Sequence, residues 1–128
     1  MITGWPSGVA TIMPQPGSHV DGVLWRISAT DEKHLDFYEG YPRLYGKESI
    51  EVIDSSGQKM TVMAYTMNSP YRECPAVPSQ GYLQGIVEGC RQNGIDPDTV
   101  CREAHRLETD RKKSRYYCKN AKAFRKER

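Results

Sequence analysis

A glutamate at the end of a predicted helix is the residue of this chain whose type and position could best do chemistry. Glu39 is followed at once by Gly40, a residue typical of helix ends, so its carboxylate would lie against the negative end of the helix dipole. The dipole and partial burial beside Tyr38 and Tyr41 both disfavour the ionised form, which would raise the pKa of Glu39 toward that of a general base. Glu39 is therefore a candidate acid/base, against the commoner alternative of a solvated side chain in a last turn.

The helix that would position Glu39 has its own start signals. Ser28 is suited to the N-cap, and Asp31, three residues later, completes a variant of the capping box. His34, Leu35 and Tyr38 follow at spacings of three and four, which places them on one helical face.

Composition indicates a single globular domain. The chain has 128 residues, of which 38% are hydrophobic and 27% charged, and this suits one core. No apolar run approaches the roughly 20 residues that span a bilayer, so no membrane partner is expected. The stretch Met1 to Gly8 lacks a basic region followed by an apolar run, so a cytoplasmic location is predicted.

The cysteines do not form a metal-binding pattern. No Cys-x-x-Cys pair occurs, and no histidine lies beside a cysteine at ligand spacing, so neither a metal nor a cofactor is expected. Cys90 falls on the apolar face of a predicted helix, and a small buried side chain explains it better than a nucleophile does. The four cysteines are Cys74, Cys90, Cys101 and Cys118.

Charge divides the chain into two parts. Residues 111–128 carry a net charge of +8 and residues 1–110 a net charge of −6. We therefore predict a domain over 1–110 and a helical basic tail over 111–128. The tail is interpreted chiefly as a solvated terminal helix; nucleic-acid binding, or contact with its own acidic domain, are the alternatives.

Hydrophobic alternation predicts strands in the first half of the chain. One hairpin is expected from Val9 to Met13 and Val20 to Ile27, and a second from Glu48 to Asp54 and Lys59 to Met67. The turn residues 55–58 join the second pair. Because the last of these strands is apolar on both faces, it is predicted to be central in a sheet curled into a barrel.

Helices dominate the second half. Ser79 is the predicted N-cap of a helix that ends at Asn93 and Gly94, and Asp96 with Pro97 opens the next one. The predicted fold class is therefore α+β: a small mixed β-barrel or curled sheet flanked by helices, with the basic tail at the C-terminus.

Five separated blocks together resemble the γ-glutamylcyclotransferase-like family. They occur in family order between residues 8 and 100. The blocks are Gly8 to Ile12, Val20 to Trp25, Leu35 to Gly40 with Leu44-Tyr45, Pro78-Ser79, and Tyr82 to Ile86 with Gly89.

The resemblance implies an enzyme that releases 5-oxoproline from a small γ-glutamyl amine or γ-glutamyl amino acid. It implies that Glu39 is the general acid/base and that Tyr45, Tyr82 and Gly40 contact the substrate. For the two tyrosines, packing in the core is the alternative. The loop from residue 68 to 77 would face the leaving group, which Tyr71 and Arg72 would contact. The alternative is that these two side chains are exposed and face solvent.

The chain departs from the family in one respect. The family's N-terminal strand and its Tyr-Gly-Ser-Asn loop, which hold the glutamyl end of the substrate, are missing. The chain could be a fragment, a second chain could supply the strand, or the activity could be lost while the scaffold is kept. Unpaired strand edges favour a homodimer or strand exchange. A circular permutation that uses Tyr117 to Asn120 in place of the loop is the least favoured explanation.

Two hypotheses of different classes remain open. The first is a γ-glutamylcyclotransferase-type enzyme centred on Glu39. The second is a catalytically inactive scaffold of the same fold, used for self-association or, through the basic tail, for nucleic-acid contact.

Overall fold

The computed structural model describes residues 8–73 and 76–113, without the side chains of 110–113. The chain divides into two units, each described by itself below. The hairpin unit consists of Thr11–Ser18 and Leu24–Arg72. The helical unit consists of the described residues of Met1–Ala10, His19–Val23 and Glu73–Arg128.

Helix α1 of the hairpin unit forms where its capping residues predict it. It spans Ala29–Glu39, and Ser28 is its N-cap. The Ser28 hydroxyl accepts a hydrogen bond from the Asp31 amide at 3.0 Å, and the Asp31 carboxylate accepts one from the Ser28 amide at 3.1 Å. Gly40 ends the helix in the left-handed conformation, with φ 66° and ψ 34°. The predicted capping box and helix end are both confirmed.

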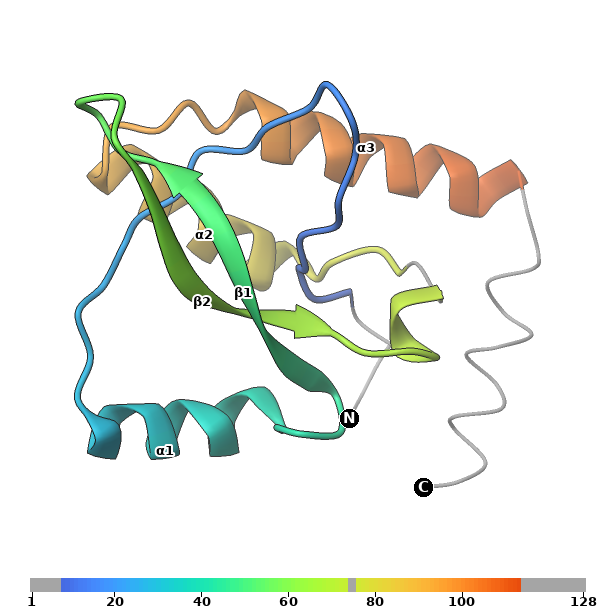
Figure 1. Cartoon of the computed structure of the whole chain (residues 1–128). Helices are drawn as coiled ribbons and strands as arrows, with labels where there is room; N and C mark the ends of the chain where they lie inside the picture. Colours follow the sequence, from blue (N-terminus) through green and yellow to red (C-terminus); the bar gives the residue numbers. More distant parts are fainter. Residues whose placement is uncertain (1–7, 74–75, 114–128) are drawn as a thin grey trace. The chain divides into compact units, whose positions relative to one another are not determined.

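The second predicted hairpin is also found: its second strand has the predicted bounds, whereas its first strand begins at Tyr45 instead of Glu48 and ends at Ile53 instead of Asp54. Strand β1 (Tyr45–Ile53) pairs antiparallel with strand β2 (Lys59–Met67), in a register that sets Tyr45 opposite Met67 and Ile53 opposite Lys59. Figure 1 shows the two strands in green, strongly twisted about each other. The Asp54 carboxylate holds the turn by accepting the backbone amides of Ser56 and Gln58, both at 2.9 Å.

The first predicted hairpin is wrong. Residues 9–13 and 20–27 form no strand ladder and are irregular, and a turn at residues 16–17 lies between them. Their apolar side chains are largely exposed; Val20 is 62% and Trp25 78% exposed. Alternating apolar residues favour a strand, but a strand also needs a backbone partner. Within the described residues, the isolated bridge at Gly8 pairs with Pro78 instead.

The barrel expected from the sequence is not among the described elements. The sheet there has two strands, β1 and β2, so β2 is an edge strand and not the central strand predicted. The α+β class itself is confirmed. The described core is correspondingly small: its buried hydrophobic side chains are Tyr45 and Val87, each 6% exposed.

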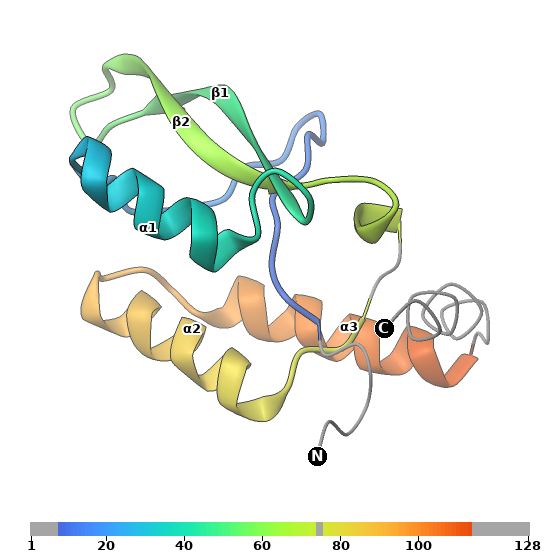
Figure 2. The same ribbon diagram turned by 90° about the horizontal axis from the view of Figure 1, so that it is seen from below.

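The helical unit contains α2 (Gln80–Gln92) and α3 (Asp98–Lys113), which pack against each other (Figure 2). Ser79 caps α2 by accepting the Tyr82 amide at 3.2 Å, as predicted. Asp96 accepts the Asp98 amide at 2.9 Å, so it caps α3 at the predicted place. None of the described helices is both long and apolar enough to cross a membrane.

The predicted basic tail falls mostly outside the described residues. Helix α3 continues to Lys113, past the expected boundary at residue 110, and residues 114–128 are not described. The division into a domain and a tail, the role of the tail and the permutation through Tyr117 to Asn120 therefore stay predictions.

Candidate active site

Glu39 is enclosed by a hydrogen-bonded helix end. The Gly40 amide donates to the Phe37 carbonyl at 3.2 Å, and the Tyr41 amide donates to the Asp36 carbonyl at 2.8 Å. These two bonds, closed by a glycine at positive φ, make a Schellman motif in which Glu39 is the last helical residue. The backbone that carries the Glu39 carboxylate is thereby fixed at both sides.

The electrostatic state of Glu39 follows from its burial. Its side chain is partly buried, and this burial raises the pKa of the carboxyl group. Among the described residues, no hydrogen bond or ion pair holds the Glu39 carboxylate. The direction agrees with the sequence prediction, although burial is the cause found. A carboxyl group in this state is easier to protonate than an ordinary glutamate, which suits proton transfer.

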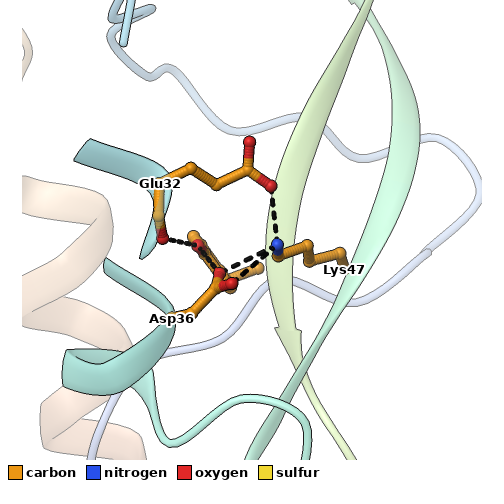
Figure 3. Close-up of polar contacts among 4 residues, drawn as sticks. Glu32, Asp36 and Lys47 are labelled. Atoms are coloured by element: carbon orange, nitrogen blue, oxygen red, sulfur yellow. Dashed lines mark hydrogen bonds and ion pairs between the residues drawn. The ribbon is translucent and has the colours of Figure 1, made fainter. Parts of the chain in front are cut away.

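Two other acids of α1 are in the opposite state. Glu32 and Asp36 lie one turn apart, and the Lys47 Nζ contacts both, at 2.6 Å from Glu32 Oε2 and 2.8 Å from Asp36 Oδ1 (Figure 3). The hydrogen bonds from Lys47 and, second, from Tyr65 hold the pKa of Asp36 below its usual value. The same two carboxylates raise the pKa of Lys47, with Asp36 the larger cause. Of these three acids, Glu39 is the one that no cation of the described residues contacts.

Tyr65 completes this cluster from the neighbouring strand. Lys47 and Tyr65 are directly opposite in the β1–β2 register, so their side chains leave the same face of the sheet. The Tyr65 hydroxyl donates to Asp36 Oδ1 at 2.5 Å, and burial, followed by this bond, raises the pKa of Tyr65 to about 12. We call Glu32, Asp36, Lys47 and Tyr65 the lysine cluster; it ties α1 to the hairpin.

The loop between Glu39 and β1 is held by Asn68, the residue that follows β2. The Asn68 side-chain amide donates to the Pro42 carbonyl at 2.7 Å and to the Arg43 carbonyl at 3.0 Å. Its backbone amide donates to the Leu44 carbonyl at 2.9 Å. A Cβ added at Gly46 would lie 2.9 Å from Asn68 Oδ1, so the glycine leaves room for this amide. Asn68 therefore fixes the path from Glu39 into β1.

Four of the other predicted site residues belong to the hairpin unit with Glu39. Gly40 follows it directly, and Tyr45 opens β1 as a buried side chain, which favours the core-packing alternative for this tyrosine. Tyr71 and Arg72 lie in a short 3-10 helix, Tyr71–Glu73, within the predicted loop. Tyr71 is partly buried and Arg72 exposed. The Arg72 guanidinium donates to the Ser69 hydroxyl at 3.4 Å.

Tyr82 belongs to the helical unit. It lies in the first turn of α2, and its hydroxyl accepts a hydrogen bond from the Ala10 amide at 2.9 Å. This bond connects the described start of the chain to α2. Such a role differs from both predictions for Tyr82, substrate contact and core packing.

Sequence reasoning missed Lys47 and Asn68. A signal for Lys47 was present, because Glu32 and Asp36 place two like charges at i and i+4 on one helical face, an arrangement that needs a cation from elsewhere. No comparable signal identifies Asn68, since its contacts are to carbonyl groups about 25 residues earlier in the chain. Within residues 8–73 and 76–113, no three His, Cys, Asp or Glu side chains gather where a metal ion could be held.

Comparison of the sequence with known proteins identifies a family. The family model described as the AIG2-like family matches residues 19–102. Gamma-glutamylcyclotransferase of Mus musculus is 35% identical over 96 residues, which are 74% of this chain and 50% of the relative. The protein of that name in Homo sapiens is 33% identical over 92 residues, 71% of this chain and 47% of the relative. The chain thus spans about half the length of these curated relatives. No solved structure matches it.

Proposed function

This chain belongs to the AIG2-like family, and we propose from that membership that it cyclises a γ-glutamyl substrate and releases 5-oxoproline. The family is the γ-glutamylcyclotransferase-like one that the sequence blocks resemble, and the name gamma-glutamylcyclotransferase, which the relatives share, supports cyclisation of a γ-glutamyl group. The substrate class in this proposal is a small γ-glutamyl amine or γ-glutamyl amino acid.

The state of Glu39 is the observation that carries the proposal. Two of the three acids along this side of α1 are neutralised by Lys47, whereas Glu39 is partly buried and has no such partner in the described structure. Burial that raises a carboxyl pKa, on a backbone fixed by hydrogen bonds, is a common property of catalytic acids and bases. The same burial without a partner would only cost stability in a structural side chain.

The reaction needs one proton-transfer group. The α-amine and the γ-carbonyl belong to the same substrate, so attack of the amine nitrogen on the carbonyl carbon is intramolecular and closes a five-membered ring. Glu39 accepts the proton that the attacking nitrogen loses. As the amide bond from the γ-carbonyl carbon to the leaving nitrogen breaks, the same carboxyl group returns a proton to that nitrogen. The products are 5-oxoproline and the free amine.

Substrate contacts are assigned by the family pattern. We propose from the family resemblance that Gly40, Tyr45 and Tyr82 contact the substrate and that Tyr71 and Arg72 contact the leaving group. The buried side chain of Tyr45 suits core packing, so its contact with the substrate rests on the resemblance alone. The partly buried position of Tyr71 supports its part of this assignment, whereas the exposure of Arg72 also suits the solvent-facing alternative.

The test is 5-oxoproline release from a panel of γ-glutamyl amines and γ-glutamyl dipeptides. The unmodified chain is expected to release product, and Glu39→Gln to release at least about 100-fold less, because it keeps the side chain's shape but cannot exchange a proton. Glu88→Gln, which changes an exposed glutamate of α2 in the same way, is the matched control and should be unaffected. Product that survives Glu39→Gln would refute the mechanism, and no product from the unmodified chain would refute the enzymatic function.

The second candidate function is an inactive scaffold that associates with a second copy of itself. Exposed aromatic side chains in the hairpin unit favour it: Phe37 is 91%, Tyr38 80% and Trp25 78% exposed. Light scattering after size exclusion should then give twice the monomer mass at micromolar concentration. Phe37→Ser together with Tyr38→Ser should lower that mass; a monomer in the unmodified chain would refute the self-association.

The remaining sequence predictions are part of the proposal. We also propose that residues 1–110 form one domain, that residues 111–128 form a basic tail, and that the protein is cytoplasmic. Nucleic-acid contact through the tail is the weaker alternative, since charge runs are unspecific. Deletion of residues 111–128 should abolish any salt-sensitive RNA binding, and binding that is unchanged by the deletion would exclude the tail.

A further inference from the structure

We infer that Lys47 is a positioning residue for Glu39, an inference that rests on the proposed function of that glutamate. Lys47 contacts the two residues whose hydrogen bond closes the helix end around Glu39. This goes beyond the family pattern, which assigns nothing to Lys47.

Helix α1 is held by polar contacts. None of its residues is fully buried, and of its apolar side chains only Leu35 is partly buried, so α1 has little apolar surface for packing. The lysine cluster supplies the connection instead: Lys47 pairs with Glu32 and Asp36, and the Tyr65 hydroxyl bonds to Asp36 (Figure 3). The Lys47 side chain is only 22% exposed, so these pairs are shielded from solvent more than ordinary surface ion pairs.

Lys47 also reaches the residue beyond the helix end. Its Nζ lies 4.4 Å from the centroid of the Tyr41 ring, a cation–π geometry. The Tyr41 amide in turn donates to the Asp36 carbonyl at 2.8 Å. One ammonium group thus binds the Asp36 side chain and the Tyr41 ring, while the backbones of these residues are joined by the bond that encloses Glu39 and Gly40.

Loss of Lys47 therefore has a defined consequence. Asp36 and Tyr41 lose their common partner, and the unshielded carboxylates of Glu32 and Asp36 repel each other across one turn. The closing hydrogen bond from Tyr41 to Asp36 weakens, and the backbone that carries the Glu39 carboxylate loses its fixed direction. A displacement of about 1 Å in a catalytic group can cost on the order of 100-fold in rate.

Two measurements on the full chain test this inference. Lys47→Met should lower kcat for 5-oxoproline release about 10- to 100-fold while KM changes less than about threefold, because Glu39 acts on substrate that is already bound. It should also speed amide exchange at Tyr41 about tenfold or more, as measured by NMR. Lys47→Arg, which keeps the charge, should restore much of both. Lys59→Met is the matched control, since Lys59 is in the same hairpin and pairs with Glu51 at an exposed 3.9 Å contact.

The outcomes separate this inference from the function on which it rests. If the unmodified chain makes no product, the enzymatic proposal fails, and Tyr41 exchange alone still decides the role of Lys47. Tyr41 exchange that is unchanged in Lys47→Met overturns the inference, as does a variant that raises KM at constant kcat. If Lys47→Met does not fold, Tyr41→Leu serves instead, because it removes only the contact between Lys47 and the Tyr41 ring. This variant should also lower kcat, by a smaller factor than Lys47→Met. If both kcat and amide exchange at the helix end are unchanged in Tyr41→Leu, the inference is overturned.

Discussion

Replacing Asn68 should loosen the loop that leads from Glu39 into β1. Asn68→Asp keeps the side chain's shape but removes both N–H donors to the Pro42 and Arg43 carbonyls, which lie at 2.7 and 3.0 Å. It also turns a carboxylate oxygen toward those carbonyl oxygens, which adds repulsion. The backbone bond from Asn68 to Leu44 remains but loses its support.

The expected magnitude follows from the two lost bonds. Each is worth about 0.5–1.5 kcal/mol net, so the local free energy of opening should fall by about 1–3 kcal/mol. Since about 1.4 kcal/mol is a factor of ten, the exchange of the Leu44 and Asn68 amides should speed up about 5- to 150-fold. These amides are suitable reporters because they donate to the Gly40 and Leu44 carbonyls at 2.9 Å.

Amide hydrogen exchange followed by NMR measures this directly. Gln84→Glu is the matched control: it also converts an amide to a carboxylate, at an exposed site of α2 with no side-chain hydrogen bond among the described residues. That control should leave both amides unchanged. Exchange at Leu44 and Asn68 that rises less than twofold in Asn68→Asp would show that the amide does not hold the loop.

Three further predictions concern α1 and its ends. Gly40→Ala should destabilise the chain by about 1 kcal/mol in urea unfolding, because alanine is strained at φ 66° and its Cβ would lie 3.3 Å from that of Leu44; an unchanged midpoint would contradict the left-handed helix end. Ser28→Ala should cost about 1 kcal/mol through loss of the N-cap, and helical circular dichroism that stays equally resistant to urea would contradict this. Glu39→Gln should stabilise the chain at pH 7, since burial raises the pKa of the carboxyl group and its ionisation therefore opposes folding. That gain should vanish below about pH 4, where the carboxyl group is protonated in both the folded and unfolded chains; a gain that persists at pH 3 would contradict the linkage.

Local signals predicted the elements around the site well. The Ser28 cap, the Gly40 helix end and the turn after Asp54 each depend on residues within five positions of one another, so the sequence contains the whole interaction. The observed β2, Lys59–Met67, coincides with its prediction for the same reason: turn chemistry sets its start and an unbroken apolar pattern its length.

Predictions that needed a distant partner did worse. The segments at 9–13 and 20–27 alternate as strands do, but alternation does not supply the neighbouring backbone, and both stay irregular and exposed. At the candidate site, the sequence predicted that Glu39 lies at the helix end. It did not predict that no cation of the described residues contacts the Glu39 carboxylate. That fact depends on which α1 carboxylates Lys47 reaches from β1, a choice made by the hairpin register and not by spacing along the chain.

The distribution of charge along α1 links fold and chemistry. A helix with no fully buried residue depends largely on polar contacts, and in α1 these contacts use Glu32 and Asp36, whose carboxylates are neutralised by Lys47. Had Lys47 reached Glu39 instead, the ion pair would hold the pKa of that carboxyl group low and make it a poor proton carrier. The stability of the helix and the role that we propose for the Glu39 carboxyl group therefore require the same arrangement, in which Lys47 pairs with Glu32 and Asp36 and does not reach Glu39.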